Sequence, residues 1–471
     1  MKFNYTKKSL LIIVLLLNGL TFSYAQTATK SAQIEQKNVE ASMEFLAGDA
    51  LQGRGSGTQF EWIAATYFAS MMKQFGIMPA GEKDVSDKQN YIQTVNIVRN
   101  SFAEPPKMTY QNVSLEHGKE ILVFSMNSGK ISGGLQKISL DDQPKNGAIN
   151  FVRLREGEDA QKLSQNFGKL LNSNAVAIII EETSQSRSNW ERSALRLPSF
   201  TTISSKTPNS PALIILSKDS ADALAKIEDG TNIEISGKLN EPEIKNTWNA
   251  VGKIEGSDPK LASEVILLSA HLDHLGVREN APSDDKIFNG ADDDASGCVA
   301  VLELARVISQ GKRPKRSVYF VVFGSEEAGG FGANYFVNNL PFPKENLVAN
   351  LEFEMIGRPD VKVAADELWL TGYDRSNLGA ELAKRGAKLV NNPHPEQNFF
   401  QRSDNYTLAR QGIIAHTVSS FGLHTDYHHA GDELKTIDFE HMTRAINSMI
   451  KPIEWLINSD FKPSWYEGKK P

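Results

Sequence analysis

The chain has 471 residues, a formal net charge of -6 at pH 7, 40% hydrophobic residues and one cysteine. This composition is typical of a globular protein, and the length favours more than one domain. The acidic balance and the lack of a Lys/Arg-rich stretch argue against nucleic acid as a partner. The one cysteine, Cys298, cannot form an internal disulfide, and we interpret it as a small core residue.

The N-terminus has the three parts of a secretory signal peptide. Lysines precede an apolar run at 10–17, and Ser23 to Ala25 form a small-x-small cleavage site. The apolar run is far shorter than the ~20 residues of a membrane-spanning helix, and no cysteine follows the cleavage site to carry a lipid. We therefore expect residues 1–25 to be a signal peptide and the mature protein to be secreted or periplasmic, without a stable membrane anchor. The oligomeric state is left open.

The remaining chain divides into three segments. A glycine-rich turn at 48–58 leads into a helical pattern at Phe60–Phe75 and an alternating strand pattern at Tyr91–Val98. The next ~145 residues contain many Ser, Asn and Lys and several short elements. Strand patterns there lie at 148–154, 175–180 and 212–216, and helical patterns lie at 161–171 and 220–227.

From Ala250 onward, strands and helices alternate to the C-terminus, as a sheet covered by helices requires. We predict an α/β fold with a mixed, mostly parallel sheet between helices. This main domain would be discontinuous, comprising 26–100 and 246–471, and a smaller α/β domain would be inserted at 101–245.

Side chains able to bind metals come directly after predicted strands. The apolar strand pattern Glu264–Ser269 runs into His271, and an acidic cluster containing Asp293 opens an amphipathic helix at Ala295–Ser309. The pattern Ser317–Phe323 continues into a pair of glutamates. In open α/β sheets, ligands bind at the edge where the carboxyl ends of the strands meet. We therefore expect these segments to converge there.

Three further segments follow the same rule. The strand pattern Leu347–Phe353 ends at Glu354, and Arg402–Tyr406 opens a helix-like segment that contains Asp404. The strand pattern Ile413–Val418 is followed by a loop with the sequence DYHHAGD.

Zinc accepts imidazole nitrogen and carboxylate oxygen, and a catalytic ion keeps one position open for water. Two neighbouring ions need a bridging carboxylate, with a histidine and a carboxylate for each ion. An additional carboxylate, as in the pair Glu326-Glu327, can take a proton from water without binding the metal. The residue types therefore predict a two-metal hydrolase site.

The order HxDHxG, GADDxASG, SEE, ExIGR, SDxY and YHxxxD resembles the zinc aminopeptidases of peptidase family M28. The segment GDALQGRGSGT resembles the start of the family's catalytic domain, and 101–245 resembles its protease-associated insertion. The resemblance implies two zinc ions and peptide substrates. It assigns His271 and Glu354 to the first ion, Asp293 to both, and Glu327 and His428 to the second.

The same resemblance assigns supporting roles. Glu326 would be the general base, and Asp273 would orient His271 through the other ring nitrogen. Asp404 and Tyr427 would line or support the site.

One position departs from the family pattern. The family usually has aspartate where this chain has Glu354, and the extra methylene moves the carboxylate outward by ~1.5 Å. Either the strand shifts to compensate, or the first ion binds more weakly. Glu352 lies two residues earlier on the same face of the strand and could assist.

Four other histidines have weaker assignments. His274 and His429 each neighbour a predicted ligand, and each could be a supporting donor instead of a ligand. His416 lies in a buried-looking strand and is expected to be a core residue. His424 lies in a loop that could reach substrate.

We therefore expect an exported zinc-dependent exopeptidase, most simply an aminopeptidase. The alternatives are a carboxypeptidase or a glutaminyl cyclase on the same scaffold, or a binding module without activity. The metal-competent residue at every ligand position argues against the last.

Overall fold

The computed structural model describes residues 33–126, 128–155, 160–171, 173–195, 197–203, 211–281 and 283–471. The predicted signal peptide at 1–25 lies outside these residues. Within them, every helix is too short or too polar to cross a membrane.

The larger part of the molecule contains a ten-stranded sheet with the order β19-β18-β20-β17-β13-β16-β12-β2-β9, and β1 pairs with β12. The strands are β1 Met78–Pro79, β2 Ile92–Ser101, β9 Ser199–Ile203, β12 Glu243–Ile254, β13 Val265–His271, β16 Ser317–Phe323, β17 Leu347–Phe353, β18 Leu368–Leu370, β19 Leu389–Asn391 and β20 Ala415–Ser419.

Parallel pairing is concentrated in the middle of this sheet, where β16, β13, β17 and β20 run in one direction. The pairs β12–β16, β2–β12, β2–β9 and β18–β20 are antiparallel. The predicted mixed α/β sheet is confirmed, but it is less parallel than expected. The physical reason is that β2 carries the chain away from the sheet and β12 brings it back, so these two neighbours must run in opposite directions.

Helices cover both faces of the sheet. Alternate residues of β13 face the two layers, because strand side chains alternate. Ile266 and Leu268 pack in one apolar core with residues of α2, α3, α8 and α12, whereas Val265 and Leu267 pack in another with residues of α9 and α11. The helices are α2 Gln36–Leu46, α3 Gln59–Gln74, α8 Gly297–Gln310, α9 Phe331–Asn338, α10 Leu378–Lys384, α11 Asp404–Ala409 and α12 Phe439–Asn458.

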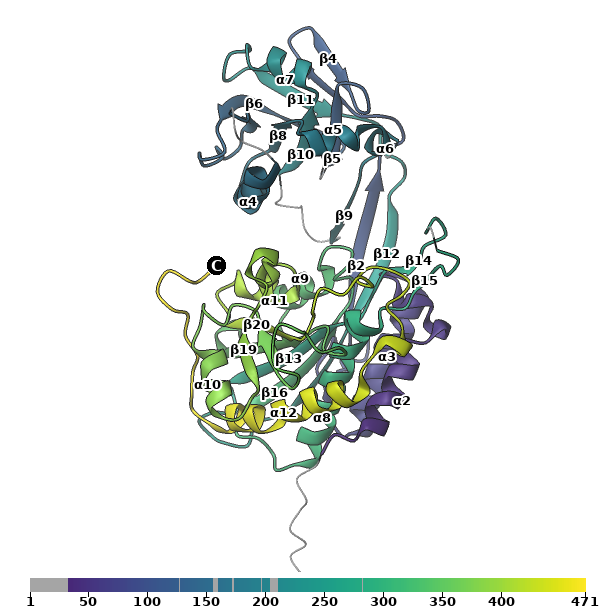
Figure 1. Ribbon diagram of the computed structural model, residues 1–471, viewed down its shortest axis with the longest axis vertical. Helices are drawn as coiled ribbons and strands as arrows, with labels where there is room; N and C mark the ends of the chain where they lie inside the picture. Colours follow the sequence, from purple (N-terminus) through teal and green to yellow (C-terminus); the bar gives the residue numbers. More distant parts are fainter. Residues whose placement is uncertain are drawn as a thin grey trace, which may run out of the picture.

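A second sheet, with the order β4-β3-β11-β6-β7-β8-β10-β5, forms a smaller body at the far end of β2 and β12 (Figure 1). It has an apolar core of its own. Its strands are β3 Lys107–Tyr110, β4 Val113–Glu116, β5 Ile121–Ser125, β6 Lys130–Ile138, β7 Ile149–Val152, β8 Ala177–Glu181, β10 Ala212–Leu216 and β11 Asn232–Ser236. Its helices are α4 Ala160–Leu171, α5 Ser184–Ser188, α6 Trp190–Ala194 and α7 Lys218–Leu224.

One strand from the predicted insertion does not stay in the smaller body. Strand β9 pairs with β2 in the main sheet, from Ile97 opposite Ile203 to Ser101 opposite Ser199. The two bodies therefore share β2, β9 and β12 as their connection. The assignment of 101–245 to a protease-associated domain remains a prediction.

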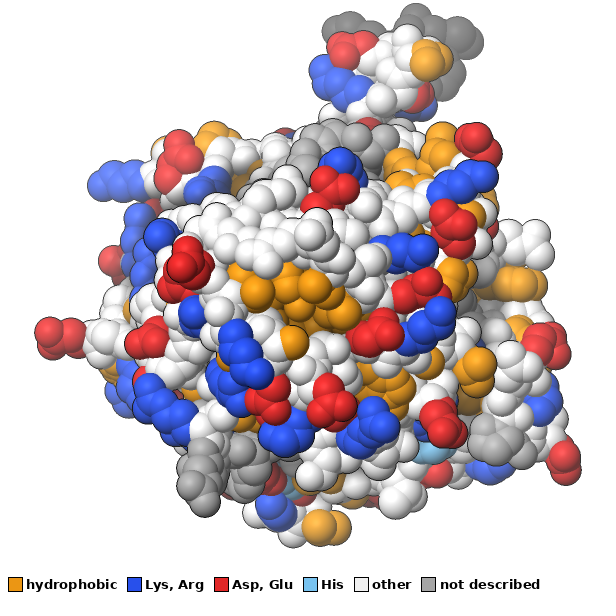
Figure 2. All heavy atoms as spheres, turned by 90° about the horizontal axis from the view of Figure 1, so that it is seen from above, with side chains coloured by type: hydrophobic (Ala, Val, Ile, Leu, Met, Phe, Trp, Pro, Cys, Tyr) orange, Lys and Arg blue, Asp and Glu red, His pale blue; other side chains and the backbone are white. Residues whose placement is uncertain are grey.

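Acidic and basic side chains are interspersed on the face shown in Figure 2. On that face, neither sign of charge forms one large continuous area.

Candidate metal centre

Three ligand-bearing segments begin where neighbouring strands end. His271 is the last residue of β13 and lies opposite Phe323, the last residue of β16, after which Glu326 and Glu327 follow. Glu354 directly follows β17. Parallel neighbours place their carboxyl ends at one edge, so these side chains start from adjacent points.

The segment carrying Asp293 is a tight turn rather than a regular helix. It lies between the short ribbon of β14 (Gly276–Val277) and β15 (Ile287–Phe288) and the start of α8. Asp293 has the extended-type angles φ -102° and ψ 93°. The carboxylate of Asp432 accepts the backbone amides of Asp292 at 2.9 Å and Asp293 at 3.0 Å, which fixes the turn.

Asp294 connects the ligand segments through their backbones. One of its oxygens accepts the amide of His271 at 3.2 Å, and the other accepts the amides of Gly297 at 3.0 Å and Met355 at 3.1 Å. A single buried carboxylate therefore sets the relative positions of β13, α8 and the end of β17.

The first group of ligand atoms comprises His271, Asp293 and Glu354, and these atoms lie within 4.8 Å of one another. The Nε2 of His271 is 3.1 Å from Asp293 Oδ1 and 3.8 Å from Glu354 Oε1. The longer glutamate arm therefore reaches this group.

The second group uses the other oxygen of Asp293. The Nε2 of His428 is 3.2 Å from Asp293 Oδ2 and 3.2 Å from Glu327 Oε1. His274, whose role the sequence left open, also falls in this group, with Nδ1 2.8 Å from Glu327 Oε1. Asp293 thus lies between two groups, as a bridging carboxylate must.

Two features of these residues suit zinc: the types of their ligand atoms, and the buried atoms among them that have no hydrogen-bond partner. Imidazole nitrogen and carboxylate oxygen are zinc ligands. Within the described residues, His271 Nε2, both ring nitrogens of His274 and Glu327 Oε1 are buried without a hydrogen-bond partner. Buried polar atoms are normally paired. A cation at each group would supply what these atoms lack.

The pKa values reflect a buried cluster of carboxylates around histidines. Burial, with the charges of Asp404, Glu354 and Glu327, raises the pKa of Glu326 well above its usual range. Burial, with Glu352 and Asp293, raises the pKa of Glu354 to about 8. So many acidic groups in one buried place strongly favour positive charge at the centre.

The charges of the histidines and carboxylates also shift each other's pKa values. Burial disfavours the charged ring of His428, but the carboxylates of Asp293 and Glu327 raise the pKa of His428 to about 9. Burial would raise the pKa of Asp293, but His271, His274 and His428 lower the pKa of Asp293 well below its usual range.

Asp273 contacts the site through both its backbone and its side chain. The Nδ1 of His271 lies 3.2 Å from the backbone oxygen of Asp273, not from its carboxylate. The carboxylate instead accepts the amides of Glu326 at 2.8 Å and Glu327 at 3.3 Å, and it also accepts the hydroxyl of Ser56. Asp273 therefore contacts the other ring nitrogen of His271, but it does so through its backbone oxygen, while its carboxylate holds the turn after β16.

Arg54 was not predicted as a functional residue, although it lies in the glycine-rich turn. The end of the short helical turn Asp49–Arg54 places it fully buried beneath the ligand loops. Its guanidinium donates to the backbone oxygens of Leu272 at 2.9 Å, Asn289 at 2.7 Å and Gly290 at 2.9 Å. A buried arginine therefore joins the loop after His271 to the loop before Asp293.

Glu61 was also missed. This fully buried carboxylate accepts the amide of Ser325 at 3.0 Å and the hydroxyl of Thr247 at 2.6 Å. Burial, with the charge of Asp273, raises the pKa of Glu61 well above its usual range. A glutamate on the buried face of an otherwise apolar helix was the available sequence signal.

Glu352 is held by groups of α11 and β20 through one of its two carboxylate oxygens. Its Oε2 accepts the amide of Asn405 at 2.6 Å and the hydroxyl of Thr417 at 3.2 Å, so it anchors the start of α11 to the sheet. Asp404 is buried nearby, and its Oδ2 has no hydrogen-bond partner among the described atoms.

The other histidines separate clearly. His416 is buried in β20, where its ring contacts Ser376 Oγ and the backbone oxygen of Thr371, both at 2.7 Å, as expected of a core residue. The Nε2 of His424 is 3.0 Å from Asp292 Oδ2, so it supports the turn of Asp293. His429 is exposed.

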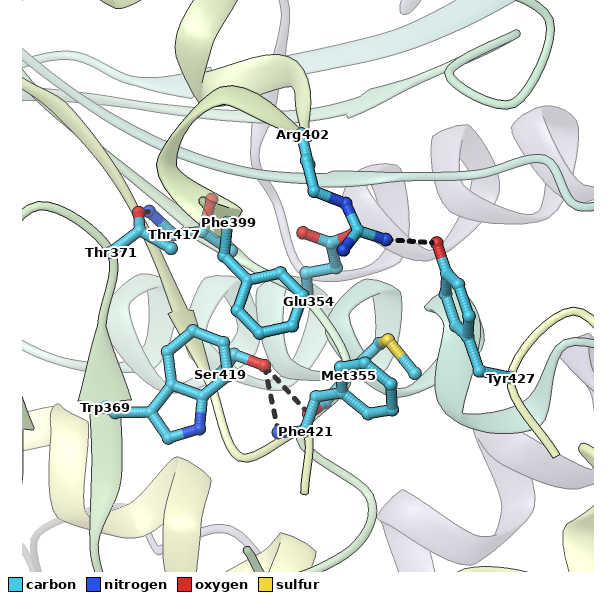
Figure 3. A pocket seen from close by; sticks show the side chains of 10 residues that line it. All are labelled: Glu354, Met355, Trp369, Thr371, Phe399, Arg402, Thr417, Ser419, Phe421 and Tyr427. Atoms are coloured by element: carbon cyan, nitrogen blue, oxygen red, sulfur yellow. Dashed lines mark hydrogen bonds between the residues drawn. The ribbon is translucent and has the colours of Figure 1, made fainter. Parts of the chain in front are cut away.

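A pocket opens beside the first group and shares Glu354 with it (Figure 3). Four of its ten lining residues are aromatic. Among them, Trp369 stacks on Phe399 at 5.3 Å and Phe421 lies 5.7 Å from Phe399 between ring centroids. Tyr427, predicted to line the site, forms another wall.

The ring of Tyr427 also stacks on the ring of His428, with centroids 3.9 Å apart. Arg402 lies over the Phe399 ring at 5.0 Å and donates to the Tyr427 hydroxyl at 3.4 Å. The pocket and the metal ligands therefore belong to one continuous site.

Comparisons with known proteins agree with this geometry. Residues 249–451 match the model of peptidase family M28. Leupeptin-inactivating enzyme 1 of Streptomyces exfoliatus is 35% identical over 206 residues, which cover 41% of this chain and 44% of that protein. A probable leucine aminopeptidase 2 of Aspergillus oryzae is 24% identical over 263 residues, 50% of each chain. The chain thus spans about half the length of these relatives.

Two solved structures share the fold across nearly the whole chain. An aminopeptidase from Aneurinibacillus sp. strain AM-1 has a TM-score of 0.51 at 20% identity, covering 90% of this chain and 95% of that one. A zinc aminopeptidase from Bacillus subtilis has a TM-score of 0.50 at 16% identity, covering 93% and 99%.

Proposed function

Through residues 249–451 the chain belongs to peptidase family M28, and on this premise we propose that the protein is an exported, zinc-dependent aminopeptidase. The residues proposed to bind two zinc ions are His271 and Glu354 for the first, Glu327 and His428 for the second, and Asp293 for both. The proposal for export comes from the sequence pattern at 1–25.

The observation that carries the proposal is that the two carboxylate oxygens of Asp293 face different ligand groups. Its Oδ1 lies 3.1 Å from His271 and its Oδ2 lies 3.2 Å from His428. Bound zinc would polarise the scissile carbonyl and lower the pKa of water. This is the chemistry that amide hydrolysis requires.

Glu326 is proposed as the general base. Its amide is fixed by Asp273 at 2.8 Å, and it is the glutamate of the 326–327 pair that lies outside both ligand groups. Its carboxylate would take the proton from water and pass it to the departing amine.

The aromatic pocket is proposed to receive the side chain next to the scissile bond. It lies beside Glu354, and Met355, Trp369 and Phe421 give it apolar walls. Burying an apolar side chain there would contribute ~25 cal/mol per Å² of apolar surface removed from water. The preference for the amino end is supported by relatives named as aminopeptidases.

The test is a peptide library assayed with added zinc and with chelator. Peptides with a free or an acetylated N-terminus, and with a free or an amidated C-terminus, should be compared at each side chain. We expect zinc-dependent cleavage that requires a free N-terminus.

Each alternative predicts a different result. A requirement for the free C-terminus instead would identify a carboxypeptidase. Cyclisation of N-terminal glutamine with one zinc per chain would identify a glutaminyl cyclase. Zinc binding without turnover of any peptide would identify a binding module.

A further inference from the structure

His274 is a buried histidine to which the family pattern assigns no ligand role. Its side chain is 0% exposed, and within the described residues both of its ring nitrogens lack a hydrogen-bond partner. A neutral imidazole has one donor and one acceptor nitrogen. Leaving both unpaired away from water is unfavourable, so a group outside the protein chain must satisfy at least one of them.

The distances around His274 show where that group lies. Its Nδ1 is 2.8 Å from Glu327 Oε1 and 3.8 Å from Asp293 Oδ2. Ligand atoms of His274, Asp293 and Glu327 all lie within 4.8 Å of one another, so one cation could contact all three side chains. The Nε2 of His271 and Asp293 Oδ1 are 3.1 Å apart, and this nitrogen is likewise unpaired. Imidazole nitrogens and carboxylate oxygens that converge in this way are the atoms that bind zinc.

The backbone holds the ring of His274 in this position. The amide of His274 donates to the backbone oxygen of Arg54 at 3.3 Å. On the other side, Gly290 has φ +60°, and a Cβ there would lie 2.5 Å from His274 Cγ. The glycine therefore allows the imidazole to pack directly against the loop that carries Asp293.

We propose that His274 is a ligand of the second zinc ion, together with Glu327, His428 and the bridging Asp293. This inference rests on the proposed function, which requires an ion in each group. The second ion would then have four protein ligands, whereas the first has His271, Glu354 and Asp293. Closed zinc sites have four protein ligands and open catalytic sites have three. The second site is therefore the tighter one, and the first ion keeps the open position.

The first experiment measures zinc affinity by competition with a chelator, with metal content determined by mass spectrometry. The His274→Asn variant keeps a polar nitrogen near the Nδ1 position, but an amide is a poor zinc ligand. The matched control is His429→Asn, because His429 is the exposed neighbour of His428.

For His274→Asn we expect the zinc affinity of the tighter site to fall by more than about 100-fold. This exceeds the loss that is typical when a residue only hydrogen-bonds to a metal ligand. The control should retain the affinities of the wild type. An unchanged chelator curve in a folded His274→Asn protein, checked by circular dichroism, would overturn the assignment.

The second experiment uses the wild type, so it does not depend on a variant that folds. With one equivalent of zinc added to the metal-free protein, X-ray absorption should show two imidazoles on the ion. A single imidazole would overturn the assignment. Two imidazoles on the ion without hydrolysis of any peptide would support the ligand role of His274 while contradicting the proposed function. The two proposals can therefore fail separately.

Discussion

The carboxylate of Asp273 accepts the backbone amide of Glu326 at 2.8 Å, although 53 residues separate them in the chain. Asp273 follows β13 and Glu326 follows β16, and the parallel register of these strands brings the two together. The contact fixes the point from which the proposed general base extends.

Replacing Asp273 with Asn tests this positioning role. The amide keeps one acceptor for Glu326 but turns an N–H toward the amide of Glu327 or the hydroxyl of Ser56. We expect kcat to fall by about 10–100-fold, the usual cost of losing a supporting partner, with both zinc ions retained. Steady-state kinetics on protein of measured zinc content checks this, and an unchanged kcat would contradict it.

Glu326→Gln removes the proposed base without changing its size. The neutral amide cannot take a proton, so we expect kcat to fall by about 10²–10⁴-fold, the typical contribution of general acid–base catalysis. Zinc content should match that of the wild type, since Glu326 lies outside both ligand groups. Full activity in this variant would assign the base to another residue.

Glu354→Asp tests whether the longer arm is required. The backbone on both sides is fixed, because Glu354 N donates to Val418 O at 3.1 Å and Met355 N donates to Asp294 at 3.1 Å. The shorter side chain would withdraw its oxygen by ~1.5 Å. We expect about one zinc ion to be lost on dialysis while the second remains, as metal analysis would show. Retention of both ions would mean that the turn moves to compensate.

Arg54→Met tests the buried arginine under the ligand loops. The variant leaves the carbonyls of Leu272, Asn289 and Gly290 without their donor, and each unpaired buried group costs about 1–3 kcal/mol. We expect the free energy of unfolding to fall by at least about 3 kcal/mol in urea titrations of the metal-free protein. Arg54→Lys keeps the charge but lacks the several N–H donors of a guanidinium, so it should recover only part of the lost stability. Equal stability of Arg54→Met and wild type would show that the loops hold their own geometry.

His416 predicts an acid-dependent loss of stability away from the metal ligands. Burial lowers the pKa of His416 to about 4 from the ordinary histidine value of 6.5. Because the unfolded state binds this proton more readily, the stability is fully present above pH 6.5 and is lost as the pH falls toward 4. The shift corresponds to about 3 kcal/mol.

The measurement is urea unfolding of the metal-free protein at several pH values, beside His416→Asn, which has no titrating ring. The wild type should lose more stability than the variant between pH 6.5 and 4. Parallel curves for the two proteins would contradict the prediction.

Much of the fold follows from local sequence patterns. The predicted strands at 317–323 and 347–353 are β16 and β17 residue for residue, because strands buried on both faces are continuous apolar runs bounded by polar residues. The same logic placed His271, the pair 326–327 and Glu354 at strand ends. The residue types of these positions, which suit zinc, indicate their part in the ligand groups.

Tertiary structure alone decided which neighbours of those residues take part. His274 and His429 each flank a predicted ligand, yet His274 is buried against Gly290 and His429 is exposed. The partner of the Asp273 carboxylate and the pairing of β9 with β2 were equally open in the sequence. The physical reason is that periodicity reports which face of an element is buried. What a side chain on that face meets depends on segments distant in the chain, whose approach is set by packing of the whole sheet.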